Sequence, residues 1–159
     1  MNRRKYTGVV LMSLLLFGCA TVSEGPAYSS ATAAPDREGY AILYVFREYA
    51  EPSLWGATIH IDGEKLATLK QGEFSQVYAT PGERVVTGVW PAISAQRESK
   101  ITLDLLAGKE YFVELTGISR VSGVSTVRVG SGLYGIDPEA AKTRLMHCCT
   151  FNPAIAQTY

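Results

Sequence analysis

Short strand-like segments alternate with tight-turn signals along most of this chain of 159 residues. Asp62-Gly63 is typical of a hairpin turn, because both residue types accept positive φ. Pro81-Gly82 and Ala107-Gly108 mark further reversals, since proline presets the backbone for a turn and glycine adopts its left-handed position. Short strands at regular spacing favour two packed sheets. We therefore predict an all-β fold, an antiparallel β-sandwich of about seven or eight strands.

The expected strands are rich in β-branched and aromatic residues or alternate between apolar and polar positions. They span residues 39–47, 57–61, 65–69, 73–79, 84–90, 100–106, 110–116 and, with a weaker Ser- and Gly-rich pattern, 121–129. Residues 48–56 contain Pro52 and Gly56 and should form a loop. One short C-terminal α-helix is expected near 137–146, because Asp137 suits the N-cap and Pro138 the first helical position.

The first 19 residues have the three parts of a bacterial lipoprotein signal. A basic cluster at residues 3–5 precedes an apolar run over 9–17, and Gly18 stands directly before Cys19. This pattern predicts a signal peptide over 1–18 and acylation of Cys19 by chains such as palmitate. An ordinary secretory peptide and a retained membrane helix are the alternatives. The apolar run is shorter than the roughly 20 residues that span a bilayer.

The small, polar residues 19–37 should form a flexible tether, because they bury too little apolar surface to order themselves. A sandwich domain is expected over 38–135, and the helix and a tail over 136–159. Ala20 stands where an aspartate would favour retention at the inner membrane, so we expect anchoring in the outer membrane, facing the periplasm. Without residues 1–18 the chain has 12 basic and 15 acidic side chains, which gives no basic field for nucleic acid.

The sequence contains no arrangement that specifies a reaction. Nucleophile-elbow and phosphate-loop motifs are missing from it, and His60 falls on the expected solvent face of a hairpin. We predict a non-enzymatic protein without a cofactor or metal site. His147, Cys148 and Cys149 are consecutive, whereas zinc ligands are usually separated by two to four residues. Cys148 and Cys149 are therefore interpreted as structural thiols or as a disulfide, within or between molecules.

Three aromatic residues are candidates for contact with a partner. Tyr49, Trp55 and Trp90 fall in or beside expected loops, where exposed aromatic side chains often anchor another molecule. Burial under the loops is the alternative, because tryptophan is on average highly buried.

Strand and turn motifs over residues 38–130 carry a resemblance to a known family. They are Tyr44–Arg47, Ile59–Gly63, Leu66–Leu69, Gly72–Phe74, Thr80–Gly82 and Ala107–Val113. In these motifs the chain resembles bacterial envelope lipoproteins that carry the domain of unknown function 2846, a small β-sandwich related in shape to PEGA-type domains. The resemblance implies no activity and no catalytic residues.

Together these patterns predict a lipid-anchored binding or accessory module. Its expected partner is an envelope protein or a cell-wall component. An envelope redox protein or other enzyme that uses Cys148 or Cys149 is the alternative.

Overall fold

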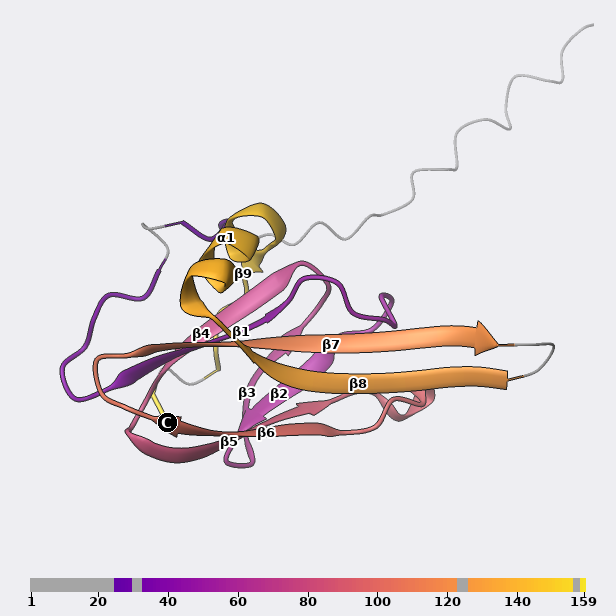
Figure 1. Cartoon of the computed structure of the whole chain (residues 1–159), viewed down its shortest axis with the longest axis horizontal. Helices are drawn as coiled ribbons and strands as arrows, with labels where there is room; N and C mark the ends of the chain where they lie inside the picture. Colours follow the sequence, from indigo (N-terminus) through magenta and orange to yellow (C-terminus); the bar gives the residue numbers. More distant parts are fainter. Residues whose placement is uncertain (1–24, 30–32, 123–125, 156–157) are drawn as a thin grey trace, which may run out of the picture.

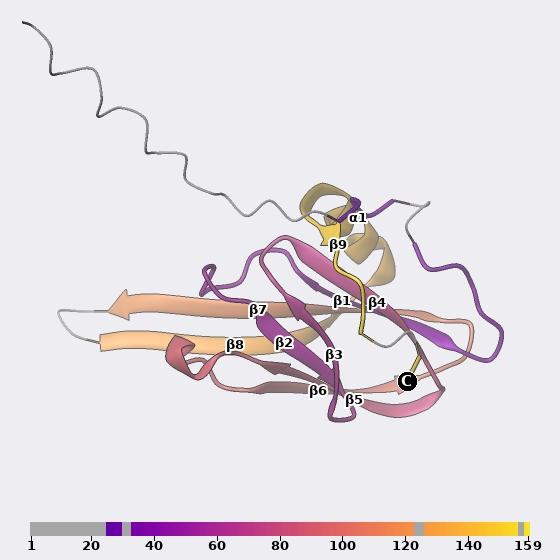
Figure 2. The same ribbon diagram turned by 180° about the vertical axis from the view of Figure 1, so that it is seen from behind.

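The computed structural model describes residues 25–29, 33–122, 126–155 and 158–159. These residues form two β-sheets packed face to face, with one α-helix on the outer face of the larger sheet (Figure 1 and Figure 2). The predicted signal peptide and Cys19 lie outside the described residues.

The elements follow the expected order, and the all-β sandwich with one short C-terminal helix is confirmed. The strands are β1 (Ala41–Arg47), β2 (Ala57–Ile61), β3 (Glu64–Leu69), β4 (Glu73–Ala79), β5 (Gly82–Val89), β6 (Ser99–Leu105), β7 (Glu110–Ser122), β8 (Thr126–Ile136) and β9 (Thr150–Phe151). The 3-10 helix η1 spans Ala92–Ser94, and helix α1 spans Pro138–Cys148. One sheet has the order β8-β7-β1-β4-β9, and the other has the order β3-β2-β5-β6.

Strand β1 is buried along its whole length because it lies in the middle of the larger sheet. Successive side chains of a strand point to opposite faces. Leu43 and Val45 accordingly belong to the core between the sheets. Tyr44 and Phe46 belong to a second core beneath α1. This double burial explains why the sequence of β1 is apolar at nearly every position.

The larger sheet is mixed. Strand β1 pairs antiparallel with β4 but parallel with β7, and β4 pairs parallel with β9. All pairs in the smaller sheet are antiparallel, as expected. The chain passes through β5 and β6 of the smaller sheet between β4 and β7, which allows β7 to return beside β1 in the same direction. The apolar periodicity of a strand does not reveal this choice.

Strands β7 and β8 form a long hairpin that extends past the other strands at one end of the molecule (Figure 1 and Figure 2). The sequence predicted one strand over 110–116 and a separate one over 121–129. These bounds were wrong, because β7 continues to Ser122 and β8 begins at Thr126. Serine and glycine residues weaken the strand pattern in the second half of β7 and in β8.

Part of the expected tether is packed on the domain. Tyr28 is only 6% exposed, and its ring meets Tyr44 and Phe74 edge-on at centroid distances of 6.0 and 5.5 Å. The amide of Tyr28 donates to the Cys149 carbonyl at 3.2 Å. The expectation of a flexible tether over 19–37 therefore does not hold for residues 25–29, where the Tyr28 ring fills a site beside α1. It also does not hold for Ala34 and Pro35, whose backbones are hydrogen-bonded to the hydroxyls of Tyr44 and Tyr78.

Helix α1 begins as the sequence predicted. The Asp137 carboxylate accepts hydrogen bonds from the amides of Glu139 and Ala140. Ala141 and Leu145, four residues apart, are the buried positions that hold the helix against the sheet. No helix of the described residues is long and apolar enough to cross a membrane.

Candidate functional site

A buried arginine organises the loop between β1 and β2. Arg47, at the end of β1, is 0% exposed. Its guanidinium donates to four backbone carbonyls, at distances between 2.6 and 3.1 Å. These carbonyls belong to Ala50, Pro52, Trp55 and Leu69. Three of the four acceptors lie in the loop over residues 48–56, so a single cation fixes its path.

The guanidinium of Arg47 also lies 4.6 Å from the centre of the Trp90 ring, a cation–π contact. Burial lowers the pKa of Arg47 to about 10, and the nearby Glu73 carboxylate opposes this shift. A pKa of about 10 leaves the side chain charged at neutral pH. Trp90 is itself only 5% exposed. Of the two interpretations of Trp90, partner contact and burial, the structure shows burial, because the ring packs against the Arg47 guanidinium.

Four large apolar side chains are exposed on neighbouring segments at this end of the sandwich. We refer to these four residues together as the loop-end surface: Tyr49 (64% exposed), Leu54 (85%), Ile93 (76%) and Ile118 (52%). Two come from the β1–β2 loop, one from η1 and one from β7. The predicted contact residue Tyr49 belongs to this surface, and Trp55 lies half-buried beside Leu54.

Hydrogen bonds hold these three segments together. The Glu51 amide donates to the Gly117 carbonyl at 3.0 Å, and the Glu51 carboxylate accepts from the Ser119 amide at 2.9 Å. The side-chain amide of Gln96, just after η1, donates to the carbonyls of Glu51 and Ile118. The exposed apolar side chains thus stand on a backbone that is fixed from several directions.

Charged side chains of α1 fasten the helix to the outer face of the larger sheet. Arg144 makes a two-pronged contact with the Glu114 carboxylate and a 2.7 Å bond to Glu48. Its hydrogen bonds to these carboxylates raise the pKa of Arg144. The Nζ atom of Lys142 lies 2.6 Å from the Oε2 atom of Glu110, and this hydrogen bond raises the pKa of the lysine. The two basic side chains of α1 are thus paired with carboxylates of the sheet and of the loop after β1, and these ion pairs hold the helix in place.

Cys148 and Cys149 form a disulfide between neighbouring residues at the end of α1. Cys149 is 3% exposed, whereas Cys148 is half-buried. His147 is exposed, and its Nδ1 lies 2.7 Å from the Thr143 carbonyl oxygen. His60 is half-buried on β2. The described residues hold no group of three or more metal-ligating side chains.

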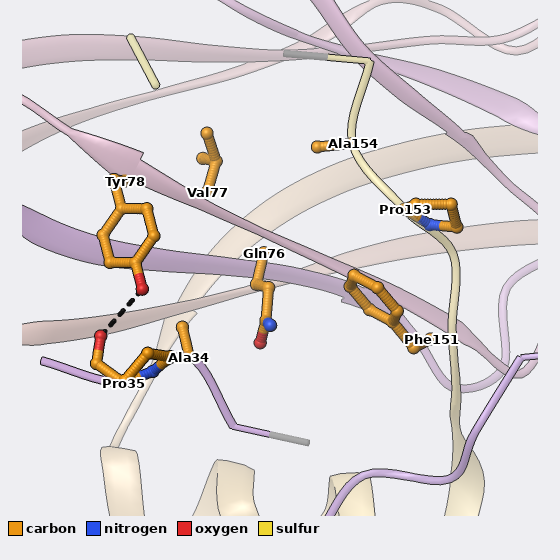
Figure 3. A pocket seen from close by; sticks show the side chains of 8 residues that line it. All are labelled: Ala34, Pro35, Gln76, Val77, Tyr78, Phe151, Pro153 and Ala154. Carbon is orange, nitrogen blue, oxygen red and sulfur yellow. Dashed lines mark hydrogen bonds between the residues drawn. The ribbon is translucent and has the colours of Figure 1, made fainter. Parts of the chain in front are cut away.

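A pocket of about 270 Å³ lies between the N-terminal segment, β4 and the C-terminal tail (Figure 3). It is mostly apolar and is lined by Ala34, Pro35, Gln76, Val77, Tyr78, Phe151, Pro153 and Ala154. The Tyr78 hydroxyl donates to the Pro35 carbonyl at 2.8 Å. Among these lining residues there is no carboxylate, imidazole or thiol.

Sequence reasoning missed the main organiser of the loop. Arg47 ends an apolar strand, where a charged residue normally points to solvent. Nothing near it in the sequence shows that carbonyls from residues 50–55 and 69 converge on it. Leu54, Ile93 and Ile118 were also missed, because single apolar residues in loops are common and become a surface only through the fold.

No protein-family model matches this sequence, and no significant similarity to a curated protein or a solved structure is found.

Proposed function

We propose that this chain is a lipid-anchored, non-enzymatic binding or accessory module of the bacterial envelope, with the loop-end surface as its contact site. The observation that carries the proposal is the exposure of Leu54 and Ile93, at 85% and 76%, on segments that hydrogen bonds hold in place. A backbone that is already fixed loses little conformational entropy when its side chains bind a partner. Large apolar side chains that stay exposed on a fixed backbone are candidates for protein–protein contact.

The signal-like sequence that ends at Cys19 supports attachment through lipid. Two or more acyl chains give stable anchoring, since each buried CH₂ contributes about 0.8 kcal/mol. Ala20 favours the outer membrane, facing the periplasm. The resemblance to envelope lipoproteins with the domain of unknown function 2846 points to the same compartment. The partner in this proposal is an envelope protein or a cell-wall component.

Photo-crosslinking in living cells tests the contact site. A crosslinker at Leu54 or Ile93 should capture the same envelope component, whereas one at Met146, 53% exposed on α1, should not. Leu54→Asp should abolish capture from position 93. Capture of the same species from all three positions, or of none, would contradict the proposed contact site.

Lipid labelling tests the anchor. Cells fed a labelled fatty acid should label the wild-type chain and not Cys19→Ala, and the variant should leave the membrane fraction. Equal labelling of the two proteins would overturn the anchoring.

The disulfide of Cys148 and Cys149 favours a second candidate, an envelope redox protein. Exchange would transfer two electrons and two protons between this disulfide and a dithiol of another protein. Alkylation of whole cells should then trap both reduced and oxidised forms of the pair. Complete oxidation under all growth conditions, together with a wild-type phenotype of the Cys148→Ser, Cys149→Ser variant, would exclude this candidate.

A further inference from the structure

Strand β8 is an open edge of the larger sheet. Its neighbour β7 directs the Gly117 carbonyl and the Ser119 amide away from β8, because both bond to Glu51. In an antiparallel pair, residues alternate between bonding across the pair and pointing outward. Ser131 and Val129 are the partners of Gly117 and Ser119, so their backbone groups point outward from the open edge.

The other sheet edges of the described residues are covered or charged. The segment at Ala27 bridges to β9, and the Phe151 amide donates to Pro26. On β3, the Leu66 carbonyl accepts from the Ile155 amide at 2.8 Å. Strand β6 carries exposed charged side chains at both ends. Covering segments and charged side chains are common ways in which proteins prevent unwanted pairing of edge strands.

Among the residues that the structure describes, no segment covers the outer edge of β8, and the strand carries few charges. Residues 126–136 contain no proline, lysine or acidic residue, and Arg128 is the single charged residue among them. A methyl group added at Gly130 or Gly135 would meet nothing within 4 Å. Val129 is 38% exposed. A long, weakly charged and uncovered edge is a template for another strand.

The smaller sheet ends at β6, which lies against β8 on the same side of the molecule. The charges around Ser99 at the start of β6 are self-complementary. The Ser99 hydroxyl of β6 lies 2.6 Å from the Ser131 hydroxyl of β8, which places these two residues one above the other. Glu98 and Lys100 stand on either side of Ser99, with opposite charges and with side chains 47% and 63% exposed. A two-fold axis near Ser99 and Ser131 would therefore bring each Glu98 toward the Lys100 of a second copy.

We propose that β8 pairs antiparallel with β8 of a second copy of this chain, about a two-fold axis at Ser131. This register sets Val129 opposite Leu133 of the second copy. Both residues direct their backbone groups outward by the same alternation, so the hydrogen bonds of the two strands match. The two larger sheets become one continuous sheet across the dimer. The charge pattern around Ser99 favours a second copy as the occupant, because an identical flank supplies both complements.

Sedimentation velocity on the purified full chain in detergent tests the dimer. Wild-type protein should sediment as a dimer. Val129→Pro should sediment as a monomer, because proline removes an outward N–H and its ring blocks the approaching strand, while the hydrogen bonds to β7 remain. Val129→Ala is the matched control and should remain dimeric. Circular dichroism and the melting temperature of Val129→Pro should show a folded protein.

Charge reversal tests the register. Glu98→Lys and Lys100→Glu should each weaken dimerisation about tenfold, a loss of about 1.4 kcal/mol, and the double variant should restore it. Glu98 and Lys100 also contact each other within one chain at 2.8 Å, so each single variant is compared with the double variant, in which the contacts within and between chains can both form again. A monomeric wild-type chain, or an equally tight dimer of folded Val129→Pro, would overturn the pairing. Charge variants that dimerise like the wild type would overturn the axis at Ser131.

Discussion

Replacing Arg47 by methionine should destabilise the protein more than any substitution of an exposed cation. Methionine has a similar length and is apolar, so the change removes the charge and the donors while it keeps most of the volume. The carbonyls of Leu69 and Ala50 are buried, whereas those of Trp55 and Pro52 are partly accessible to water. Water can reach the last two when the guanidinium is removed, whereas the first two lose a donor that water cannot replace.

The magnitude follows from these two acceptors. A buried polar group without a partner costs about 1–3 kcal/mol, so the pair costs about 2–6 kcal/mol. The cation–π contact with Trp90 is lost as well. Removal of the buried charge returns part of this cost, since burial already penalises the charged form of Arg47. We expect a net loss of about 3–5 kcal/mol in the free energy of unfolding.

Urea denaturation followed by circular dichroism measures this loss. Arg97→Met is the matched control, because Arg97 is exposed, and we expect a change within about 0.5 kcal/mol. Arg47→Lys should lie between wild type and methionine, since an ammonium has three donors for four carbonyls. If Arg47→Met unfolds within about 1 kcal/mol of the wild type, the four hydrogen bonds do not organise the loop.

Burial raises the pKa of Tyr44, so its contribution to stability is complete below about pH 10 and is lost as the pH rises further. Tyr44→Phe should therefore flatten the fall in melting temperature between about pH 10 and 12; an unchanged profile would contradict this. Gly117→Ala would place a methyl group 2.0 Å from the Glu51 carbonyl oxygen and should cost about 2–4 kcal/mol in urea denaturation. Gly130→Ala, which meets nothing within 4 Å, should change stability by less than about 1 kcal/mol, and equal losses at both glycines would refute the packing. Arg144→Met should cost about 1–2 kcal/mol and make stability less sensitive to salt, because its ion pairs are partly exposed; a wild-type salt dependence would count against them.

Local signals predicted the turns and the helix well. Asp62 and Gly63 have φ values of 50° and 87°, the conformation that a two-residue hairpin requires. The Asp137 cap also depends only on the next three residues. Such features follow from the conformational preferences of a few neighbouring residues, so a single sequence is enough to find them.

Contacts between distant segments could not be predicted in this way. The parallel pairing of β1 with β7 joins residues 42 and 110, and the same apolar pattern would suit an antiparallel partner. Tyr28 stands alone in a polar segment, and its site exists only after α1 packs on the sheet. The loop-end surface likewise combines a loop, η1 and β7, which no local pattern relates.

The packing of residues 25–29 sets the route by which a mechanical pull enters the domain. Tension applied before Gly25 reaches the bridge between Ala27 and Thr150 and the Tyr28 ring before it reaches β1. These few contacts would therefore break first under such a pull. Their release would free residues 25–29, while Pro35 stays hydrogen-bonded to Tyr78 and the parallel pair of β1 and β7 stays intact. A chain that is pulled at its N-terminus therefore lengthens at residues 25–29 before its β-sheets unfold.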